Sequence, residues 1–358
     1  MGDDRMGQYK ITYKVKDKVD PTVELDFSKP QRTSRYANPQ TQDWVKGTQQ
    51  DELVDDALQN PNWQWHDPKD PTTGTLSDNV FRLLNDTYFQ SYKTFASTKK
   101  EPGQTPTESL SLEMIHNNLH QWSGGGGRDK NNIPADGHMA NVPVASFDPI
   151  FWMHHRNVDR LFAIWQYLNP HSWLTPDDDP KPTDRLQPFH RDEQGTVYTS
   201  DDTRPWKRFG YTYPELVDGI TKDDLRKVIA QKYGKSVSKL KEARSVDSGV
   251  TEHEFQDYII NVQYDRYALD GHPYTINFFL KIDDEHVYKL SQVFNFSAEG
   301  DGTCPNCEAQ RREGVLSTGQ VPISIPLHKV MRQEESLVKG VPYLSGTSPG
   351  LHFTLGSC

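Results

Sequence analysis

The spacing of apolar residues predicts long helices in the first half of the chain. Apolar side chains recur at helical spacing in LSDNVFRLLNDTYFQSYKTF (76–95), SLSLEMIHNNLHQW (109–122) and FDPIFWMHHRNVDRLFAIWQYL (147–168). Ser and Glu are start signals for the second of these helices, and Asp148 is the expected N-cap of the third. A shorter helix is expected in DELVDDALQN (51–60). This half of the chain is therefore predicted to be mainly helical.

The pattern changes after Phe255, where alternating apolar residues predict strands. Turn signals such as DG and DD separate the segments YIINVQYDRYAL, YTINFFLKI, HVYKLSQVFNF and VPISIPL. We therefore expect a mainly α fold in two domains. A helical domain would cover 1–245, and a β-rich, sandwich-like domain would cover 246–358.

Charge and composition argue against several kinds of partner. The 358 residues carry a net charge of −10 without a dense run of Lys and Arg, so nucleic acid is not an expected partner. No run approaches the roughly 18 apolar residues of a membrane helix, and MGDDRMGQYKITYKVKDK lacks the apolar stretch of a secretory signal. Cys304, Cys307 and Cys358 are too few for a disulfide framework. We therefore expect a cytoplasmic protein that does not enter a membrane.

Two pairs of histidines indicate a metal site. His116 and His120 in HNNLH are four residues apart, which places both imidazoles on one face of a helix. His154 and His155 are adjacent and would point about 100° apart on a helix, so only one of them is expected to bind the same ion. Three imidazoles with water in the fourth position are typical of catalytic zinc, and copper also accepts imidazole. The spacing leaves open which histidine of the doublet binds and which metal is held.

Longer motifs around these histidines resemble a known family. HNNLH, then GHM, then FDPIFWMHHRNVDRLFAIWQ resemble the second-copper half of tyrosinases, catechol oxidases and hemocyanins, over about residues 30–175. YDRY, the strands and CPNC resemble, more weakly, the C-terminal domain of fungal tyrosinases. The resemblance implies a tyrosinase/hemocyanin-like helical core. It also implies that the metal ligands are His116, His120 and His155.

The same resemblance implies roles for neighbouring residues. Phe151 matches an aromatic residue that leans over the metal site, and Asn117 matches an asparagine beside the first ligand. Asp159 would lie outside the ligands and hold the second N–H of an imidazole. We expect Phe151, His154 and Trp122 to contact the substrate.

The dinuclear centre of this family needs a second histidine triad upstream, and only His66 precedes His116 in this sequence. His66 lies in NWQWHDP, which we interpret as a loop with the histidine on the surface or in packing. We therefore expect a core that lacks the first-copper half and binds one zinc ion (Zn2+) per chain, with copper as the alternative. Type-3 chemistry binds dioxygen as peroxide between two coppers, so a single ion implies non-oxidative Lewis-acid chemistry.

One fungal group with these features is the cyclopenases of quinolone alkaloid biosynthesis, which look like truncated tyrosinase/hemocyanin proteins that bind zinc. The resemblance implies a lyase-like enzyme of secondary metabolism with a small aromatic substrate. It would convert a cyclopenin-type epoxy-benzodiazepinedione into a viridicatin-type 4-aryl-2-quinolone, with loss of methyl isocyanate. The alternatives are a copper phenol or catechol oxidase whose other triad comes from a partner, and a non-catalytic hemocyanin-like binding protein. Missing helices would expose an apolar face, so a homodimer is a candidate assembly.

Two further features have alternative interpretations. Glu113 lies one turn before His116 and is the candidate general acid/base; the alternative is a structural carboxylate bonded to a ligand imidazole. CPNC (304–307) is interpreted as a turn of the β domain, either reduced or closed by a local disulfide. We expect the β domain to shape the substrate pocket.

Overall fold

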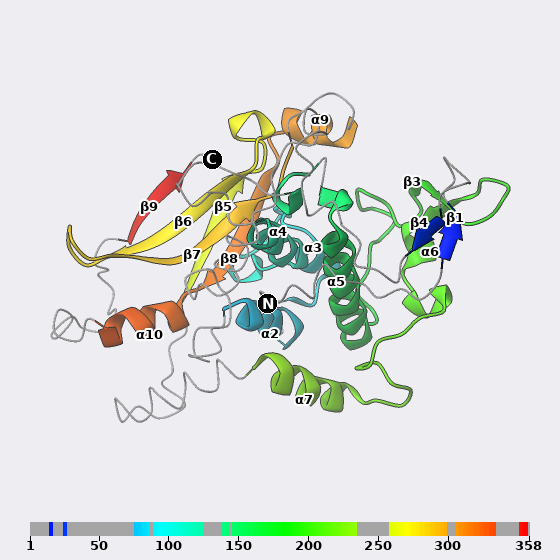
Figure 1. The fold of residues 1–358 in the computed structure, drawn as a ribbon, viewed down its shortest axis with the longest axis horizontal. Helices are drawn as coiled ribbons and strands as arrows, with labels where there is room; N and C mark the ends of the chain where they lie inside the picture. Colours follow the sequence, from blue (N-terminus) through cyan, green and yellow to red (C-terminus); the bar gives the residue numbers. More distant parts are fainter. Residues whose placement is uncertain are drawn as a thin grey trace.

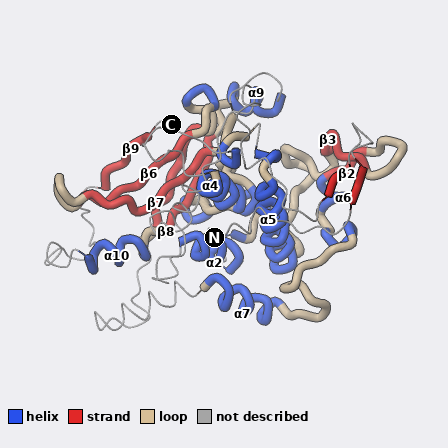
Figure 2. Tube along the Cα trace, in the orientation of Figure 1, coloured by secondary structure: helices blue, strands red, loops and turns tan. Residues whose placement is uncertain are grey.

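The computed structural model describes residues 14–16, 24–26, 75–85, 89–124, 138–142, 145–234, 258–298, 305–333 and 351–356. The helix predicted at 51–60 and the side chain of His66 lie outside these residues. Figures 1 and 2 show the helices of residues 75–233 on one side of the antiparallel strands of residues 259–322. Within the described ranges, no helix combines the length and the apolarity that a membrane crossing requires.

The main helices of the described part are α2 (Thr75–Asn85), α3 (Tyr92–Ala96), α4 (Leu112–Ser123), α5 (Pro149–Leu168) and α7 (Lys222–Tyr233). The helices predicted at 109–122 and 147–168 are confirmed as α4 and α5. The segment 76–95 was predicted as one helix, and the structure instead divides it between α2 and α3. Ser91 precedes α3 in an extended conformation (φ −81°, ψ 128°), which does not continue a helix.

Side-chain caps fix the beginning of the two long helices. The hydroxyl of Ser111 accepts a hydrogen bond from the backbone N–H of Met114 at 3.2 Å, at the start of α4. The carboxylate of Asp148 accepts from the N–H of Ile150 at 3.1 Å, and Pro149 follows at the first position of α5. The predicted N-cap is therefore confirmed.

The β part consists of two antiparallel sheets. Strand β5 (Ile259–Asp265) pairs with β8 (Leu316–Pro322). In the other sheet, β7 (Val287–Asn295), β6 (Tyr274–Lys281) and β9 (Leu351–Gly356) lie in the order β7-β6-β9. The first three predicted strand segments are confirmed.

The fourth predicted strand, VPISIPL, is wrong beyond Pro322. The chain forms helix α10 (Ser324–Gln333) there. Pro326 lies in the first turn, where backbone N–H groups have no partner within the helix, so a proline is compatible with a helix at this position. The smaller elements are β1 (Lys14–Lys16), β2 (Glu24–Asp26), β3 (Arg185–His190), β4 (Val197–Thr199), α6 (Ser200–Thr203), α9 (Pro305–Arg312) and the 3-10 helices η5 (Pro106–Glu108), η6 (His138–Ala140), η7 (Ala145–Phe147), η8 (Trp206–Phe209) and η10 (Leu269–Gly271).

Helix α4 lies between the strands and α5, and one hydrophobic core joins the two parts (Figure 1). Phe95 and Trp165 stack in this core with ring centroids 4.1 Å apart. Val293 of β7 and Val321 of β8 are fully buried in the same cluster. Buried residues on both sides of position 245 therefore share a core, and the division into two domains stays a prediction.

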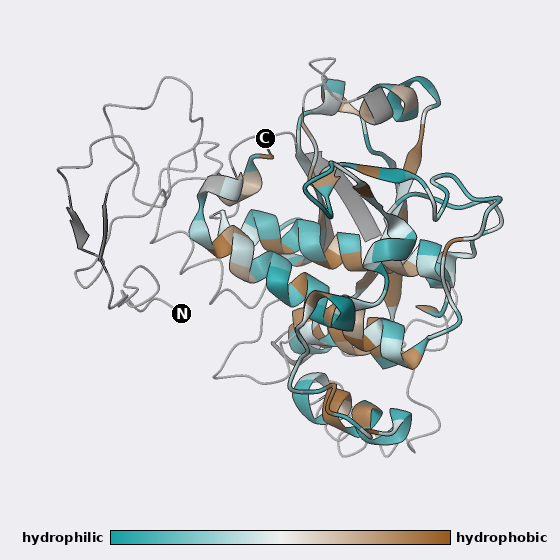
Figure 3. Cartoon of the chain, turned by 90° about the vertical axis from the view of Figure 1, so that its right-hand side faces the viewer, coloured by the Kyte–Doolittle hydropathy of each residue, from teal (hydrophilic) through white to brown (hydrophobic). Residues whose placement is uncertain are grey.

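The helices around this core are amphipathic. Figure 3 shows polar and apolar residues side by side on each of them. In α7 the buried residues are Leu225 and Ile229, four positions apart on one face. This pattern places the apolar face of each helix inward and leaves the polar face at the surface.

Candidate metal centre

Helices α4 and α5 bring four histidines together. His116 and His120 come from one face of α4, and His154 and His155 come from the beginning of α5. One ring nitrogen from each histidine belongs to a group in which all four atoms lie within 4.8 Å of one another. His120 and His154 are buried, and His116 and His155 are half-buried. The cluster therefore joins the two histidine pairs that the sequence analysis singled out.

Two of the imidazoles have a fixed tautomer. Nδ1 of His116 lies 2.9 Å from Oδ1 of Asn117, and Nδ1 of His120 lies 2.6 Å from the carbonyl oxygen of Met139. Both oxygens are acceptors, so each Nδ1 carries the proton and donates it. Each Nε2 is then left with a lone pair. This is the state of a histidine that binds a metal ion through Nε2.

The separations of the Nε2 atoms fit one shared ion. Nε2 of His116 lies 3.0 Å from Nε2 of His120 and 3.4 Å from Nε2 of His155. Nitrogens bound to a tetrahedral zinc ion at about 2.0–2.1 Å lie about 3.3 Å from one another. Neither His116 nor His120 has an Nε2 proton to donate in the neutral state. A cation between the rings satisfies their lone pairs.

His154 has a different environment from the other three histidines. Its ring stacks on His116, with centroids 5.0 Å apart and an interplanar angle of 22°. Neither of its ring nitrogens has a hydrogen-bond partner among the described residues. Burial, followed by the neighbouring imidazoles, lowers the pKa of His154 to about 2, although the backbone of His116 acts in the opposite direction. His154 is therefore a neutral, buried imidazole within the cluster, without the hydrogen bond that orients His116 or His120.

Burial also keeps the other imidazoles neutral. It is the largest cause that lowers the pKa of His120 to about 3 and the pKa of His155 to about 4. Burial lowers the pKa of His116 as well, against the Asn117 hydrogen bond and the charge of Glu113, which raise it. Neutral imidazoles bind metal ions without first releasing a proton, so the cluster is prepared for an ion at neutral pH.

Two phenylalanines cover the cluster. Phe151 of α5 lies against His155, with ring centroids 4.1 Å apart, where the sequence analysis expected an aromatic residue over the site. Phe296, directly after β7, stacks on His120 at 4.1 Å with an interplanar angle of 16°. Phe296 was not among the residues predicted from the sequence. It is distant in the sequence from the histidines, and no local pattern distinguishes it from other strand-end aromatics.

Met139 was also missed, because its contribution is a backbone carbonyl. The GHM motif places it in η6, and η6 lies against the end of α4. A side chain at Gly124 would approach Cβ and N of Ala140 to 2.8 Å. Glycine at this position therefore permits the contact that brings the Met139 carbonyl to His120.

The residues predicted to lie around the ligands have mixed outcomes. Asn117 bonds to His116, as expected. The carboxylate of Asp159 accepts hydrogen bonds from Tyr211 at 2.8 Å and from Tyr213, and not from an imidazole as expected. The physical reason is that the hydroxyls of Tyr211 and Tyr213, in the segment before α7, both donate to Oδ2 of Asp159. Trp122 is fully buried in α4, and its contact with a substrate stays a prediction.

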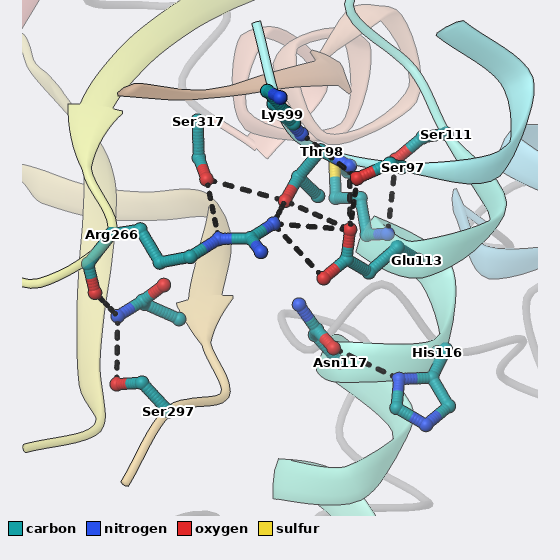
Figure 4. Close-up of polar contacts among 12 residues, drawn as sticks. Ser97, Thr98, Lys99, Ser111, Glu113, His116, Asn117, Arg266, Ser297 and Ser317 are labelled. Atoms are coloured by element: carbon teal, nitrogen blue, oxygen red, sulfur yellow. Dashed lines mark hydrogen bonds and ion pairs between the residues drawn. The ribbon is translucent and has the colours of Figure 1, made fainter. Parts of the chain in front are cut away.

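Glu113 points away from the imidazoles and toward Arg266 (Figure 4). Its carboxylate accepts from Arg266 Nη2 at 3.0 Å and from the backbone N–H of Thr98 at 2.7 Å. Burial raises the pKa of Glu113, but Arg266 and these hydrogen bonds outweigh burial and hold the pKa below its ordinary value. An ionised carboxylate bound by Arg266 and Thr98 favours a structural role. The general acid/base role stays a prediction, and Asn117, not Glu113, bonds the imidazole of His116.

Two further features of the described residues are the oxidation state of Cys307 and the exposure of Trp152. Cys307 is disulfide-bonded, which favours the oxidised form of CPNC, but residues 305–307 begin helix α9 and do not form the turn that was predicted. Trp152 is 64% exposed beside the cluster and donates its indole N–H to the carbonyl of Ser146 at 3.2 Å. The described residues therefore place an exposed aromatic side chain on the surface of α5 next to half-buried Phe151 and the histidines.

Comparison with known proteins identifies both parts of the chain. Residues 4–168 match the family described as the common central domain of tyrosinase, and residues 257–346 match the tyrosinase C-terminal domain. The first match contains the four clustered histidines. The second contains Arg266 and Phe296.

Individual relatives agree with these matches. A protein named tyrosinase from Aspergillus fumigatus is 38% identical over 348 residues, which are 89% of this chain and 53% of that protein. Polyphenol oxidase 3 of Agaricus bisporus is 28% identical over 345 residues, with 86% of this chain and 53% of that protein covered. The crystal structure of melB holo-protyrosinase from Aspergillus oryzae has a TM-score of 0.63 at 33% identity and covers 87% of this chain and 51% of that one. The chain thus spans about half the length of the curated relatives it matches.

Proposed function

The chain belongs to the tyrosinase family, and on that premise we propose that it is an enzyme whose histidine cluster binds one metal ion and acts on a small aromatic substrate. One observation carries the proposal. The Nδ1 atoms of His116 and His120 donate to protein oxygens, so that two Nε2 lone pairs face each other at 3.0 Å. His155 supplies the third Nε2, 3.4 Å from that of His116.

We further propose that the ion is zinc and that the reaction is non-oxidative. Zinc, when bound, supplies a Lewis acid for a substrate oxygen. The protein side chains orient the substrate and exclude water from it. The rings of Phe151 and Phe296 flank the cluster and offer aromatic faces, and His154 is a neutral imidazole buried within it. An aromatic substrate can stack on such rings while its oxygen faces the three Nε2 atoms.

The resemblance to cyclopenases supports a specific reaction within this proposal. A cyclopenin-type epoxy-benzodiazepinedione has the carbonyl and epoxide oxygens that a Lewis acid activates. It would be converted into a viridicatin-type 4-aryl-2-quinolone with loss of methyl isocyanate. One-ion chemistry is supported by the geometry of the cluster, in which the ligand nitrogens of the histidines lie within 4.8 Å of one another.

A copper-dependent phenol or catechol oxidase is the second candidate. It is favoured by relatives that are named tyrosinase and polyphenol oxidase. Three imidazoles also suit copper. In this case a second triad would come from a partner, because type-3 oxygen chemistry needs two coppers.

Metal analysis of the purified protein tests the proposal. We expect one zinc per chain, lost in the His116→Ala/His120→Ala variant and retained in His171→Ala, which removes an exposed histidine outside the cluster. Turnover of the epoxy-benzodiazepinedione should continue without dioxygen. If the protein instead contains copper and its turnover of phenols stops when dioxygen is removed, the zinc proposal is wrong and the oxidase candidate is supported. A folded protein that binds neither metal would contradict both.

A further inference from the structure

Arg266 lies between the helix that carries His116 and the segment that carries Phe296. It follows β5 directly, outside the histidine cluster. Figure 4 shows its side chain directed toward Glu113 of α4 and its main chain directed toward the segment of Ser297. One residue of the β part therefore contacts a neighbour of His116, namely Glu113, and a neighbour of Phe296, namely Asn295, through different atoms.

The side chain of Arg266 connects three segments of the fold. Its Nη2 donates to both carboxylate oxygens of Glu113, at 3.0 and 3.1 Å, and its Nε donates to the hydroxyl of Ser317 in β8 at 3.1 Å. The same carboxylate accepts from Thr98 N at 2.7 Å and from Ser97 Oγ at 2.9 Å. Glu113 is one turn before His116, so this network fixes the beginning of the histidine face of α4.

The main chain of Arg266 holds the segment of Phe296. Its carbonyl oxygen accepts from Asn295 Nδ2 at 2.8 Å, and the same amide donates to Ser297 Oγ at 2.9 Å. Asn295 and Ser297 are buried, and they flank Phe296 in the sequence. Phe296 stacks on His120 at 4.1 Å. The bridge therefore fixes the residues on both sides of the stacked ring.

A second contact joins β7 to α4, but it does not reach the end of β7, where Asn295 bonds to Arg266. The backbone N–H of Phe294 donates to Oδ1 of Asn118 in α4 at 2.9 Å. This bond holds β7 against α4. It does not involve the Asn295 amide, which bridges the Arg266 carbonyl and the Ser297 hydroxyl.

We propose that Arg266 is a positioning residue that keeps Phe296 stacked on His120, because its guanidinium binds Glu113 of the histidine helix while its carbonyl binds Asn295. The guanidinium is planar and donates to Glu113 and Ser317 from two nitrogens at once. A lysine has a single ammonium nitrogen and cannot reproduce the planar, two-nitrogen geometry of these contacts. A change in the Glu113 contact therefore moves the Arg266 backbone and, with it, the Phe296 ring.

The position of the ring can be measured in the metal-free protein. The Cε1–Hε1 resonance of His120, in protein with isotope-labelled histidine, reports the ring current of a stacked Phe296. His120→Gln assigns the resonance, and Phe296→Leu gives its position without the ring. We expect Arg266→Met to shift the resonance toward its position in Phe296→Leu, and the double variant Arg266→Met/Phe296→Leu to shift it no further.

Two further variants make the outcome decisive. Arg82→Met removes a comparable ion pair, between part-buried Arg82 and buried Asp78 of α2, and should leave the His120 resonance unchanged. Arg266→Lys keeps the positive charge and serves as the test variant if Arg266→Met does not fold. It should shift the His120 resonance in the same direction. Two results would overturn the proposal. In the first, the His120 resonance moves in Phe296→Leu but keeps its position in the folded Arg266 variants. In the second, the His120 resonance does not move in Phe296→Leu.

The consequence for catalysis rests on the proposed function and has its own measurement. If the cluster binds metal, Arg266→Met should weaken the metal affinity on the order of 10-fold, as is usual for residues that orient ligands from outside the coordination shell. The resonance test uses metal-free protein. A protein that binds no metal would refute the proposed function and leave the role of Arg266 to be decided by the resonance alone.

Discussion

The Nε2 atoms of His116 and His120 face each other at 3.0 Å, although neither carries a proton in the neutral state. The i, i+4 spacing on α4 brings the rings together, and Asn117 and the Met139 carbonyl fix their tautomers. Two lone pairs at this distance repel each other unless a proton or a metal ion lies between them. The arrangement therefore favours a cation between the two Nε2 atoms.

Removing the acceptor beside His116 should weaken metal binding. Asn117→Ala leaves Nδ1 of His116 without its 2.9 Å partner, so the ring can rotate and adopt the other tautomer. We expect metal affinity to fall by roughly 10- to 100-fold, measured by competition with a chelator. Asn117→Asp keeps an acceptor oxygen at this position and should restore most of the affinity. Equal affinities of the alanine variant and the unchanged protein would contradict this role.

The stability of the metal-free protein should decrease as the pH falls below about 6.5. Burial is the main cause of pKa values of about 3 for His120 and about 2 for His154, against an ordinary value of 6.5. Between the ordinary and the folded pKa, the unfolded chain binds protons that the folded chain does not, so acid favours unfolding. Above pH 6.5 both states are neutral and these groups add no pH dependence. Urea unfolding at a series of pH values measures the slope.

A histidine variant provides the control for that pH dependence. His154→Phe removes one buried imidazole and should reduce the slope between pH 6.5 and pH 4, because one fewer group binds a proton only on unfolding. His171→Ala removes an exposed histidine and should leave the slope as it is. A slope that is the same in all three proteins would show that the buried imidazoles do not cause it.

The sequence predicted the histidine cluster because its information is local. The HNNLH spacing, the doublet and the Asp148 cap each follow from helical geometry within a few residues. Phe296 reaches His120 from a strand more than a hundred positions away, and only the folded chain shows that contact. Asp159 has the expected position on α5 but bonds to Tyr211 and Tyr213, and no local pattern predicts which distant hydroxyl reaches it.

The strand predicted at VPISIPL shows a different limit. Its alternating apolar residues suit a strand, yet the strand ends at Pro322 and α10 begins at Ser324. Buried Val321 belongs to the strand, and buried Ile325 and Leu327 belong to the helix. Over so short a run, both conformations bury the same residue types, so tertiary contacts decide between them.

Removing the stacked ring should open the cluster to solvent. Phe296→Ala leaves the face of His120 without its partner at 4.1 Å. We expect a chelator to remove the metal faster than from the unchanged protein, and we expect the KM for an aromatic substrate to rise as a stacking surface is lost. Phe209→Ala removes a partly exposed ring that stacks on Tyr211, away from the histidines, and should change neither quantity. Unchanged metal release in Phe296→Ala would mean that this ring does not cover the site.

The helix that carries His155 depends on a buried ion pair. Arg160 donates from Nε to Glu215 at 3.1 Å and from Nη1 to the hydroxyl of Tyr233 in α7 at 3.0 Å. The Arg160 side chain is 12% exposed and the Glu215 side chain is 8% exposed. The variant Arg160→Met therefore leaves a buried carboxylate whose remaining charged partner is Lys232. We expect the free energy of unfolding to fall by about 3 kcal/mol in urea titrations, since breaking a buried pair from one side costs more than the pair contributes. Lys207→Met breaks an exposed pair with Asp218 and should leave stability nearly unchanged. Equal losses in the two variants would contradict a special role for Arg160 in holding α5.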